Sequence, residues 1–248
     1  MEHFIVALVI LFFSSMIQAM IGFAFNLIAI PLLIWSGFSL AESVVLTVIP
    51  IFVQLSVNFI KLKEHIVWQD VKLPIIIRYI TLPIGIWILY KLNTLDTTLI
   101  KQIVGLILLL IIALDMFVSF EYKEKVSILW TILAFSISGV MLGMLGMGGP
   151  AIVVWLMMHN WSAKRVRAFI TTVFLFASSV QIALLYWQFS SNAKESFLLG
   201  LWATPIVILG ALIGVRIGNK FDRLKLRKAV LFFLFLTAIF SIFSPYIH

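Results

Sequence analysis

The residues with the clearest chemical meaning form the run Gly146-Met147-Gly148-Gly149-Pro150, inside a long apolar segment. Glycine loosens a helix, and proline removes a backbone donor and clashes with the preceding turn. A helix that begins beyond such a break presents free N–H groups and the positive end of its dipole, and both suit an anion. The run therefore predicts a broken membrane helix with an anion as its ligand.

The first apolar segment of the chain carries a weaker form of the same signal. Gly22 and Asn26 lie in it, and Pro31 follows them. Gly139 and Gly143 carry a different signal, because small residues four apart let two membrane helices pack closely. We therefore predict a second, weaker break near Gly22 and a packing role for the glycine pair.

Neutral polar side chains accompany both breaks. Amide and hydroxyl groups can donate to an oxyanion without placing a full charge in the membrane. Taken alone, each of them more often forms a hydrogen bond between helices than a ligand contact. Together with the residues of the two breaks, the candidate substrate-binding residues are Gln18, Gly22, Asn26, Thr47, Gly146, Gly148, Gly149, Pro150, Thr171 and Thr172.

Four ionisable residues are candidates for balancing an anion or carrying a coupled proton: Arg78, Asp115, Glu42 and His159. Arg78 lies well inside an apolar segment, where a cation is costly and by default marks a pathway or a partner. It could balance an anion, pair with Asp115, or extend to the interface. Glu42 and Asp115 are acidic groups near segment ends. His159 could titrate near neutral pH or be a solvated interfacial histidine.

The composition places these residues in a membrane protein. Of the 248 residues, 63% are hydrophobic and 11% are charged, whereas a soluble domain has roughly 45–50% and 25%. With no cysteine and four scattered histidines, the sequence predicts neither a disulfide nor a metal site. The net charge of +8 is typical of basic cytoplasmic loops. No basic stretch interleaved with aromatic residues indicates nucleic-acid binding.

Charged residues divide the chain into eight apolar segments, each long enough to approach or exceed a hydrocarbon core of about 30 Å. The segments are Phe4 to Trp35, Val44 to Ile60, Leu73 to Tyr90, Gln102 to Phe120, Val126 to Met158, Ala168 to Ala193, Ser196 to Val215 and Ala229 to Ile247. Lipid satisfies no backbone hydrogen bonds, and these runs lack the alternation of barrel strands. We therefore expect an all-α polytopic membrane protein. The first segment is too long for a secretory signal, so we expect it in the mature structure.

The two halves of the chain resemble each other. A shift of about 124 residues places Gly146 on Gly22 and Thr171 on Thr47, and a slightly larger shift places Gly214 on Gly85. We therefore predict two homologous four-segment repeats, residues 1–120 and 121–248, which together form one membrane domain. The first long segment of each repeat is predicted to be broken near its motif.

The distribution of Lys and Arg predicts an orientation if every segment crosses once. One side then receives the eleven residues Lys91, Lys101, Lys164, Arg165, Arg167, Arg216, Lys220, Arg223, Lys225, Arg227 and Lys228. The other side receives the six residues Lys61, Lys63, Lys72, Lys123, Lys125 and Lys194. The more basic side is expected to be cytoplasmic, which places both termini outside. The long segments could instead form hairpins; an odd number of crossings per half would invert the repeats.

Several motifs resemble those of the sulfite exporter family named for TauE and SafE. They are the G-M-G-G-P run, the string Arg167-Ala168-x-x-Thr171-Thr172 and the G-x-x-x-G pattern from Gly214. In the first half the matching features are Gln18 to Asn26, Thr47, KLKEHIVW and Gly85. The resemblance implies transport of small sulfur-containing anions, such as sulfite or sulfonates, most often outward across a bacterial inner membrane.

A secondary transporter follows as the leading hypothesis, in which one repeat rocks against the other around an anion site. No G-x-x-x-x-G-K-[ST] motif is present to bind ATP, so a gradient must drive it. An anion channel is the nearest alternative. An intramembrane enzyme is disfavoured because H-E-x-x-H and G-x-S-x-G are absent. An assembly factor without flux is the last alternative. We expect no cofactor, a small anionic substrate and contact with lipid; a homo-oligomer and proton coupling are compatible with the sequence.

Overall fold

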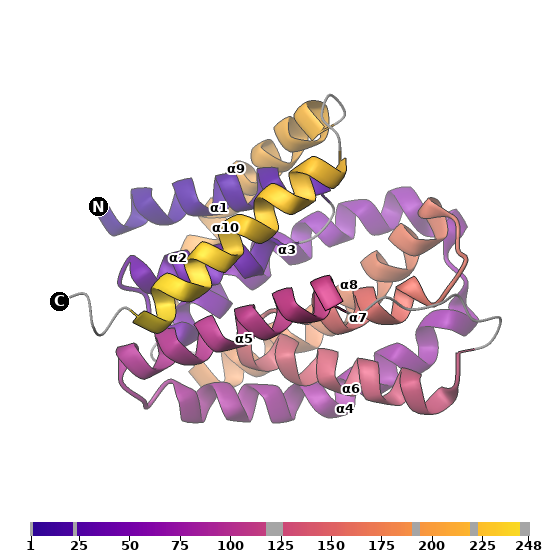
Figure 1. Ribbon diagram of the computed structural model, residues 1–248, viewed down its shortest axis with the longest axis horizontal. Helices are drawn as coiled ribbons and strands as arrows, with labels where there is room; N and C mark the ends of the chain where they lie inside the picture. Colours follow the sequence, from indigo (N-terminus) through magenta and orange to yellow (C-terminus); the bar gives the residue numbers. More distant parts are fainter. Residues whose placement is uncertain (1, 22–23, 118–125, 190–193, 219–222, 244–248) are drawn as a thin grey trace. The chain divides into compact units, whose positions relative to one another are not determined.

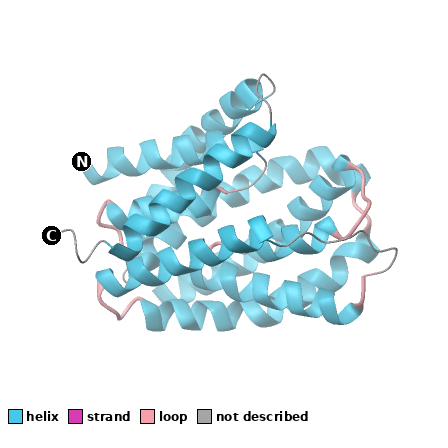
Figure 2. Ribbon diagram, in the orientation of Figure 1, coloured by secondary structure: helices cyan, strands magenta, loops and turns pink. Residues whose placement is uncertain are grey.

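The computed structural model describes residues 2–21, 24–117, 126–189, 194–218 and 223–243, and within these ranges the chain is helical with no strand (Figures 1 and 2). The helices are α1 (Glu2–Ile21), α2 (Phe25–Trp35), α3 (Leu40–Leu62), α4 (Trp68–Leu92), α5 (Thr97–Phe117), α6 (Ile128–Leu145), α7 (Gly149–Met157), α8 (Ala163–Phe189), α9 (Lys194–Gly218) and α10 (Arg223–Phe243), with a short 3₁₀ turn η1 (Lys63–His65) after α3.

Seven helices of the described residues are long and apolar enough to cross a membrane. They are His3–Met20, Leu40–His65, Trp68–Leu92, Thr97–Leu114, Ile128–Leu145, Ala163–Phe189 and Lys194–Gly218. Phe25–Trp35 and Lys228–Phe243 are shorter apolar helices. The chain is therefore a polytopic all-helical protein as predicted. The expected eighth segment, Ala229 to Ile247, overlaps the second short helix, so the count of eight stays a prediction.

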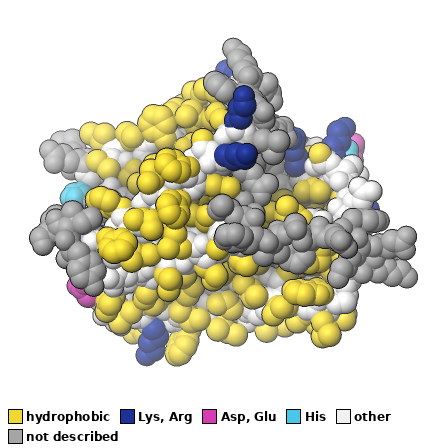
Figure 3. Space-filling view, in the orientation of Figure 1, with side chains coloured by type: hydrophobic (Ala, Val, Ile, Leu, Met, Phe, Trp, Pro, Cys, Tyr) yellow, Lys and Arg dark blue, Asp and Glu magenta, His cyan; other side chains and the backbone are white. Residues whose placement is uncertain are grey.

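The surface of these helices is apolar. Ile76, Ile80 and Ile84 recur every four residues along α4, and all three are exposed. Trp202 on α9 and Phe232 on α10 are exposed as well. Hydrophobic side chains occupy much of the face seen in Figure 3. Soluble proteins rarely expose apolar patches of this extent, so the outward side chains are those of a protein surrounded by lipid.

The helices pack as two compact units, each of which combines helices from both halves of the sequence. Unit 1 contains α1, α2, α5, α9, α10 and α3 up to Pro50. Unit 2 contains the rest of α3, α4 up to Tyr90, α6, α7 and α8. This division follows packing, whereas the predicted repeats follow the order of the sequence.

The first long segment is a helical hairpin in unit 1. His3 Nδ1 at the start of α1 donates to the backbone oxygen of Ser36 after α2, at 3.0 Å. The His3 ring also meets the Phe38 ring edge-on, with 6.3 Å between centroids. The chain thus returns to the end of unit 1 from which it started. The structure selects the hairpin alternative, and the single-crossing premise of the orientation count is wrong for this segment.

The second long segment is a helical hairpin in unit 2. Trp155 Nε1 on α7 donates to Thr131 Oγ1 in the first turn of α6, at 3.0 Å. The Trp155 ring also contacts Phe135 of α6, with 5.1 Å between centroids. These two rings, together with Ile152, Phe169 and neighbouring apolar side chains, form a buried core of unit 2. The end of α7 therefore returns to the start of α6.

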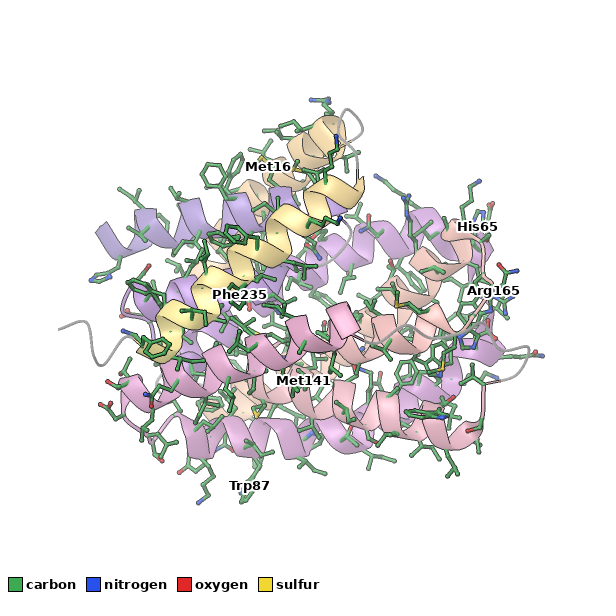
Figure 4. All side chains as sticks on the ribbon, viewed as in Figure 1. Met16, His65, Trp87, Met141, Arg165 and Phe235 are labelled. Atoms are coloured by element: carbon green, nitrogen blue, oxygen red, sulfur yellow. The ribbon has the colours of Figure 1, made fainter. Side chains whose placement is uncertain are left out.

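Glycines set the close packing of each hairpin on a neighbouring helix. In unit 2, α4 lies against α6: Gly85 packs on the Val140 carbonyl, and a Cβ on either Gly85 or Gly143 would lie 2.9 Å from the other glycine's Cα. In unit 1, α9 lies against α1: Gly214 packs on the Met16 carbonyl and the Ala19 side chain (Met16 is labelled in Figure 4). Both helix pairs run parallel. The predicted packing role of Gly143, and of Gly139 against Thr81, is confirmed.

Candidate functional site

The interruption in unit 2 has a defined backbone geometry. Helix α6 ends at Gly146, which has a φ of 66° and whose N–H donates to the Leu142 carbonyl at 2.8 Å. Glycine adopts this left-handed conformation at no steric cost. Ser138 Oγ donates to the Gly148 carbonyl at 2.6 Å. Helix α7 then begins at Gly149, with Pro150 in its first turn. The glycine-rich run therefore ends one helix and begins another, as its composition indicates.

Arg78 lies beside this interruption and is fully buried in unit 2. A Cβ built on Gly148 would lie 2.7 Å from Nη2 of Arg78, so the guanidinium occupies the space that this glycine leaves. Nη1 donates to the Val173 carbonyl at 3.5 Å, and the guanidinium carbon lies 4.3 Å from the centre of the Phe174 ring. Nε and Nη2 have no acceptor in the part of the chain that the structure describes. Their hydrogen-bonding capacity is available.

Helix α8 brings two of the polar candidates, Thr171 and Thr172, and a further buried polar residue, Gln181, into unit 2. Thr171 and Thr172 are buried, and Thr172 Oγ1 donates to the Ala168 carbonyl at 2.7 Å. Gln181 Nε2 donates to the Leu142 carbonyl at 2.8 Å. Gln181 therefore supports the end of α6, as the interhelical alternative for such residues anticipates.

The interruption in unit 1 is built differently. Gly22 lies outside the described residues. Ala24 has a φ of 88°, which is rare for a residue with a side chain. On α1, Gln18 Oε1 and Ser14 Oγ are buried and accept or donate no hydrogen bond among the described residues. Asn26 lies in the first turn of α2. The sequence analysis missed Ser14, although its place one helical turn before Gln18 was a signal.

Thr47 is buried in the part of α3 that belongs to unit 1. Its Oγ1 donates to the Val44 carbonyl at 3.0 Å, within the same helix. Glu42 lies in the first turn of α3 and accepts from the Ser39 backbone N–H at 2.7 Å, while Ser39 Oγ accepts from the Glu42 N–H at 3.2 Å. This reciprocal pair is a capping box, which gives Glu42 a structural role. The S-x-x-E spacing was visible in the sequence.

The other ionisable candidates lie apart from the interruptions. Asp115 is in α5, and its side chain lies outside what the structure describes, so its pairing with Arg78 stays a prediction. His159 follows α7, donates from Nδ1 to the Trp155 carbonyl at 3.0 Å, and stacks on Trp155 with 4.0 Å between ring centroids. Desolvation by burial lowers the pKa of His159, although the Trp155 carbonyl favours the protonated ring.

An ion pair that the sequence did not predict lies near His159. Nε and Nη2 of Arg165 both donate to one carboxylate oxygen of Asp70, at 3.1 Å and 2.6 Å. The Arg165 guanidinium lies over the Trp161 ring, 4.4 Å from its centre. Figure 4 shows Arg165 at one end of unit 2. The two partners are 95 residues apart in the sequence, so no local pattern could have revealed them.

Seven apolar spans and two interrupted hairpins define a polytopic membrane protein whose helix breaks lie within apolar segments, as in many transporters. The sequence profile of the family described as Sulfite exporter TauE/SafE matches residues 7–241, and the chain belongs to this family. It is therefore a membrane transporter and not an enzyme. No curated protein and no solved structure matches the chain.

Proposed function

We propose that the chain is a secondary transporter that moves sulfite or small organosulfonates outward across a bacterial plasma membrane by alternating access. The observation that carries this proposal is the pair of apolar helical hairpins, each interrupted where neutral donors and helix ends are available. Helix N-termini and uncharged donors suit a small oxyanion, because they stabilise negative charge without requiring many fixed cations in the membrane. The family agrees with a sulfur oxyanion as substrate.

The proposal includes two homologous repeats. Under a shift of 124 residues, Val140 and Gly143 of α6 correspond to Met16 and Ala19 of α1. Gly85 packs on the first pair and Gly214 packs on the second pair. Gly85 and Gly214 are themselves the residues that the sequence comparison aligns. The two hairpins therefore use corresponding positions to contact corresponding helices, which supports a duplication.

Hairpins also change the expected topology. Each half then has one returning hairpin and three crossing helices, an odd number that inverts the second repeat relative to the first. The less basic side carries Lys91, Lys101 and Lys194, each in the first or last turns of its helix. The other side carries the fourteen residues Lys61, Lys63, Lys72, Lys123, Lys125, Lys164, Arg165, Arg167, Arg216, Lys220, Arg223, Lys225, Arg227 and Lys228.

This bias is stronger than the one that single crossings give, and it moves Lys61 and Lys63 to the more basic side. Cytoplasmic loops collect Lys and Arg, so the fourteen-residue side is proposed to be cytoplasmic and both termini external. Cysteines introduced at Ser36 and at Ser162 test this topology. A membrane-impermeant thiol reagent should label Ser36→Cys and not Ser162→Cys in intact cells, and the reverse result would contradict the proposal.

The proposed substrate-binding residues are those of the two interruptions and the buried threonines beside them: Gln18, Gly22, Asn26, Thr47, Gly146, Gly148, Gly149, Pro150, Thr171 and Thr172. Arg78 is added as the cation nearest to an interruption. Glu42 is a weaker candidate because of its capping role, and proton coupling through Asp115 or His159 is open to direct measurement.

Uptake of sulfur-35-labelled sulfite, sulfoacetate and sulfate into proteoliposomes tests the function. Saturable uptake that accelerates when unlabelled substrate is present on the opposite side supports a transporter. A unitary current instead of saturable exchange would identify the channel alternative. Repeating the uptake with an imposed proton gradient decides whether protons are coupled. If none of the three anions is taken up, the proposed substrate class is wrong.

A further inference from the structure

We propose that Arg78 is the charged centre of an oxyanion site that unit 2 contains and unit 1 lacks, and that it holds two oxygens of one ionised sulfur oxyanion through Nε and Nη2. This inference deepens the proposed function and rests on it for the identity of the anion. The residues of this site all lie in unit 2.

Arg78 is a charged side chain that is fully buried. An arginine side chain stays protonated in proteins, so a full positive charge lies in the interior of unit 2. A buried charge is costly unless it is paired and hydrogen-bonded. Phe174 and the Val173 carbonyl meet part of this cost, yet two donor nitrogens are left without an acceptor in the described ranges. A missing anionic partner explains both the charge and the free donors.

The two nitrogens of Arg78 without an acceptor among the described residues are neighbours in the guanidinium group. Nε and Nη2 form one edge of the planar guanidinium, the edge that can donate two parallel hydrogen bonds to an oxyanion. Arg165 in the same unit uses this edge: its Nε and Nη2 both donate to the Asp70 carboxylate. Arg78 presents the same edge with no carboxylate on it. Because this edge offers two parallel donors, it can also meet two oxygens of one oxyanion, which a single-atom anion cannot supply.

Arg78 lies against the start of helix α7. Nη2 lies against Gly148, the residue directly before α7. The first N–H groups of a helix lack intrahelical acceptors and carry the positive end of its dipole. A Cβ built on Gly149 would meet no atom within 4 Å, so open space adjoins the start of α7. The Arg78 guanidinium thus lies at Gly148, and the start of α7 and the open space lie at the next residue, Gly149.

Unit 1 has no arginine at the position that corresponds to Arg78. The register that aligns Gly85 with Gly214 aligns Arg78 with Val207 on α9. Val207 is fully buried, and it carries no polar atom in its side chain. Unit 1 instead has the neutral groups of Ser14 and Gln18 on its hairpin. At this pair of aligned positions, the positive charge is therefore present in unit 2 and absent from unit 1.

Thermal unfolding of the purified full-length protein tests this site, with sodium sulfite, sodium methanesulfonate or sodium chloride added at equal ionic strength. A ligand that binds only the folded state raises the melting temperature. For the wild type, we expect sulfite and methanesulfonate to raise it and chloride to raise it much less. Arg78→Met should abolish the increase and, because it removes an unpaired buried charge, should melt no lower than the wild type without anion.

Arg78→Lys keeps the charge and removes the two-donor edge, so we expect sulfite affinity to fall by roughly tenfold or more and the preference over chloride to disappear. Because Arg78→Lys keeps the charge, it tests the site even if Arg78→Met does not fold. Gly148→Ala is a poorer test, because its Cβ would lie 2.7 Å from the Ser138 carbonyl oxygen as well as from Nη2 of Arg78. The matched control is Arg216→Gln, because Arg216 is an exposed arginine on α9.

An Arg78→Met protein with the wild-type response to sulfite would overturn the inference, as would a wild-type protein that responds to chloride as strongly as to sulfite. A destabilised Arg78→Met protein whose sulfite response is intact would assign Arg78 a structural role. Flux separates the two proposals. If sulfite binds through Arg78 but liposomes take up none, the transport function fails and the site stands; if Arg78→Met liposomes transport sulfite normally, the site fails and the function stands.

Discussion

Units 1 and 2 place the same arrangement of helices around different side chains. In each, a hairpin of two helices packs through glycine on a parallel helix. Unit 2 interrupts its hairpin with Gly146 in the left-handed region and places Arg78 beside Gly148. Unit 1 has Ala24 in the left-handed region and Val207 at the position of the arginine. The two units thus share a glycine contact between hairpin and neighbouring helix, whereas the residues at their interruptions differ in conformation and in charge.

The largest effects are expected where the two units agree. Gly85→Leu and Gly214→Leu each place a side chain on the backbone of the adjoining helix, at the Val140 and Met16 carbonyls. Because backbone cannot give way cheaply, either variant should remove most folded protein from the membrane. Membrane fractionation and size-exclusion chromatography measure this. Normal amounts of either variant would show that its unit does not depend on the glycine contact.

Gly149→Leu should separate folding from transport. The space around its Cβ is open, so we expect normal membrane insertion. The larger side chain fills the space next to the start of α7 and should reduce sulfite uptake to near background. Uptake and protein level are measured on the same membranes. Unchanged flux would remove the interruption of unit 2 from the transport pathway.

Two serines at corresponding positions of the units, Ser138 and Ser14, differ in their hydrogen bonding. Ser138 donates to Gly148, whereas Ser14, its counterpart under the 124-residue shift, has no partner among the described residues. Ser138→Ala leaves a buried carbonyl without a donor and should cost about 1–3 kcal/mol of stability. Ser14→Ala removes an unsatisfied hydroxyl and should be neutral or slightly stabilising. Unfolding by a denaturing detergent measures both; equal losses would mean that the two serines have similar roles.

The left-handed residues predict opposite effects of opposite substitutions. Ala24→Gly should stabilise the protein, because a left-handed alanine costs about 1–2 kcal/mol relative to its right-handed form, and glycine does not have this cost. Gly146→Ala should destabilise it by a similar amount. The same unfolding experiment compares the two variants. If both destabilise, Ala24 is held by contacts that outweigh its backbone conformation.

The smallest expected effect is a pH dependence that belongs to unit 2. His159 corresponds to Trp35 of unit 1 under the same shift. Burial lowers the pKa of His159 from its ordinary value of 6.5, so the unfolded chain binds its proton more readily. Its contribution to stability is present above pH 6.5 and is lost as the pH falls through the lowered pKa. His159→Gln should make the melting temperature depend less on pH in this window. An unchanged pH dependence would assign it to another group.

The sequence predicted the helices and the interruption in unit 2, because apolar length and the glycine–proline run act locally. It could not choose between a crossing helix and a hairpin for Phe4 to Trp35, because both have the same uncharged apolar residues and differ only in long-range contacts such as that of His3 with Ser36. The burial of Arg78 was foreseeable from its place in an apolar run. The contact of Arg78 with Gly148 was not foreseeable, because these residues are 70 positions apart and meet only through the packing of α4 on α6.

The hairpins also bear on how the chain enters the bilayer. No Asp, Glu, Lys or Arg lies between Glu2 and Glu42, or between Lys125 and Lys164. The two ends of each hairpin lie at the same end of its unit, so the hairpin can partition as a closed loop without carrying a charged residue through the hydrocarbon. Moving a charge to the centre of a bilayer costs several kcal/mol at least. The uncharged tips thus allow each interruption to reach its final depth during biogenesis without a translocated loop.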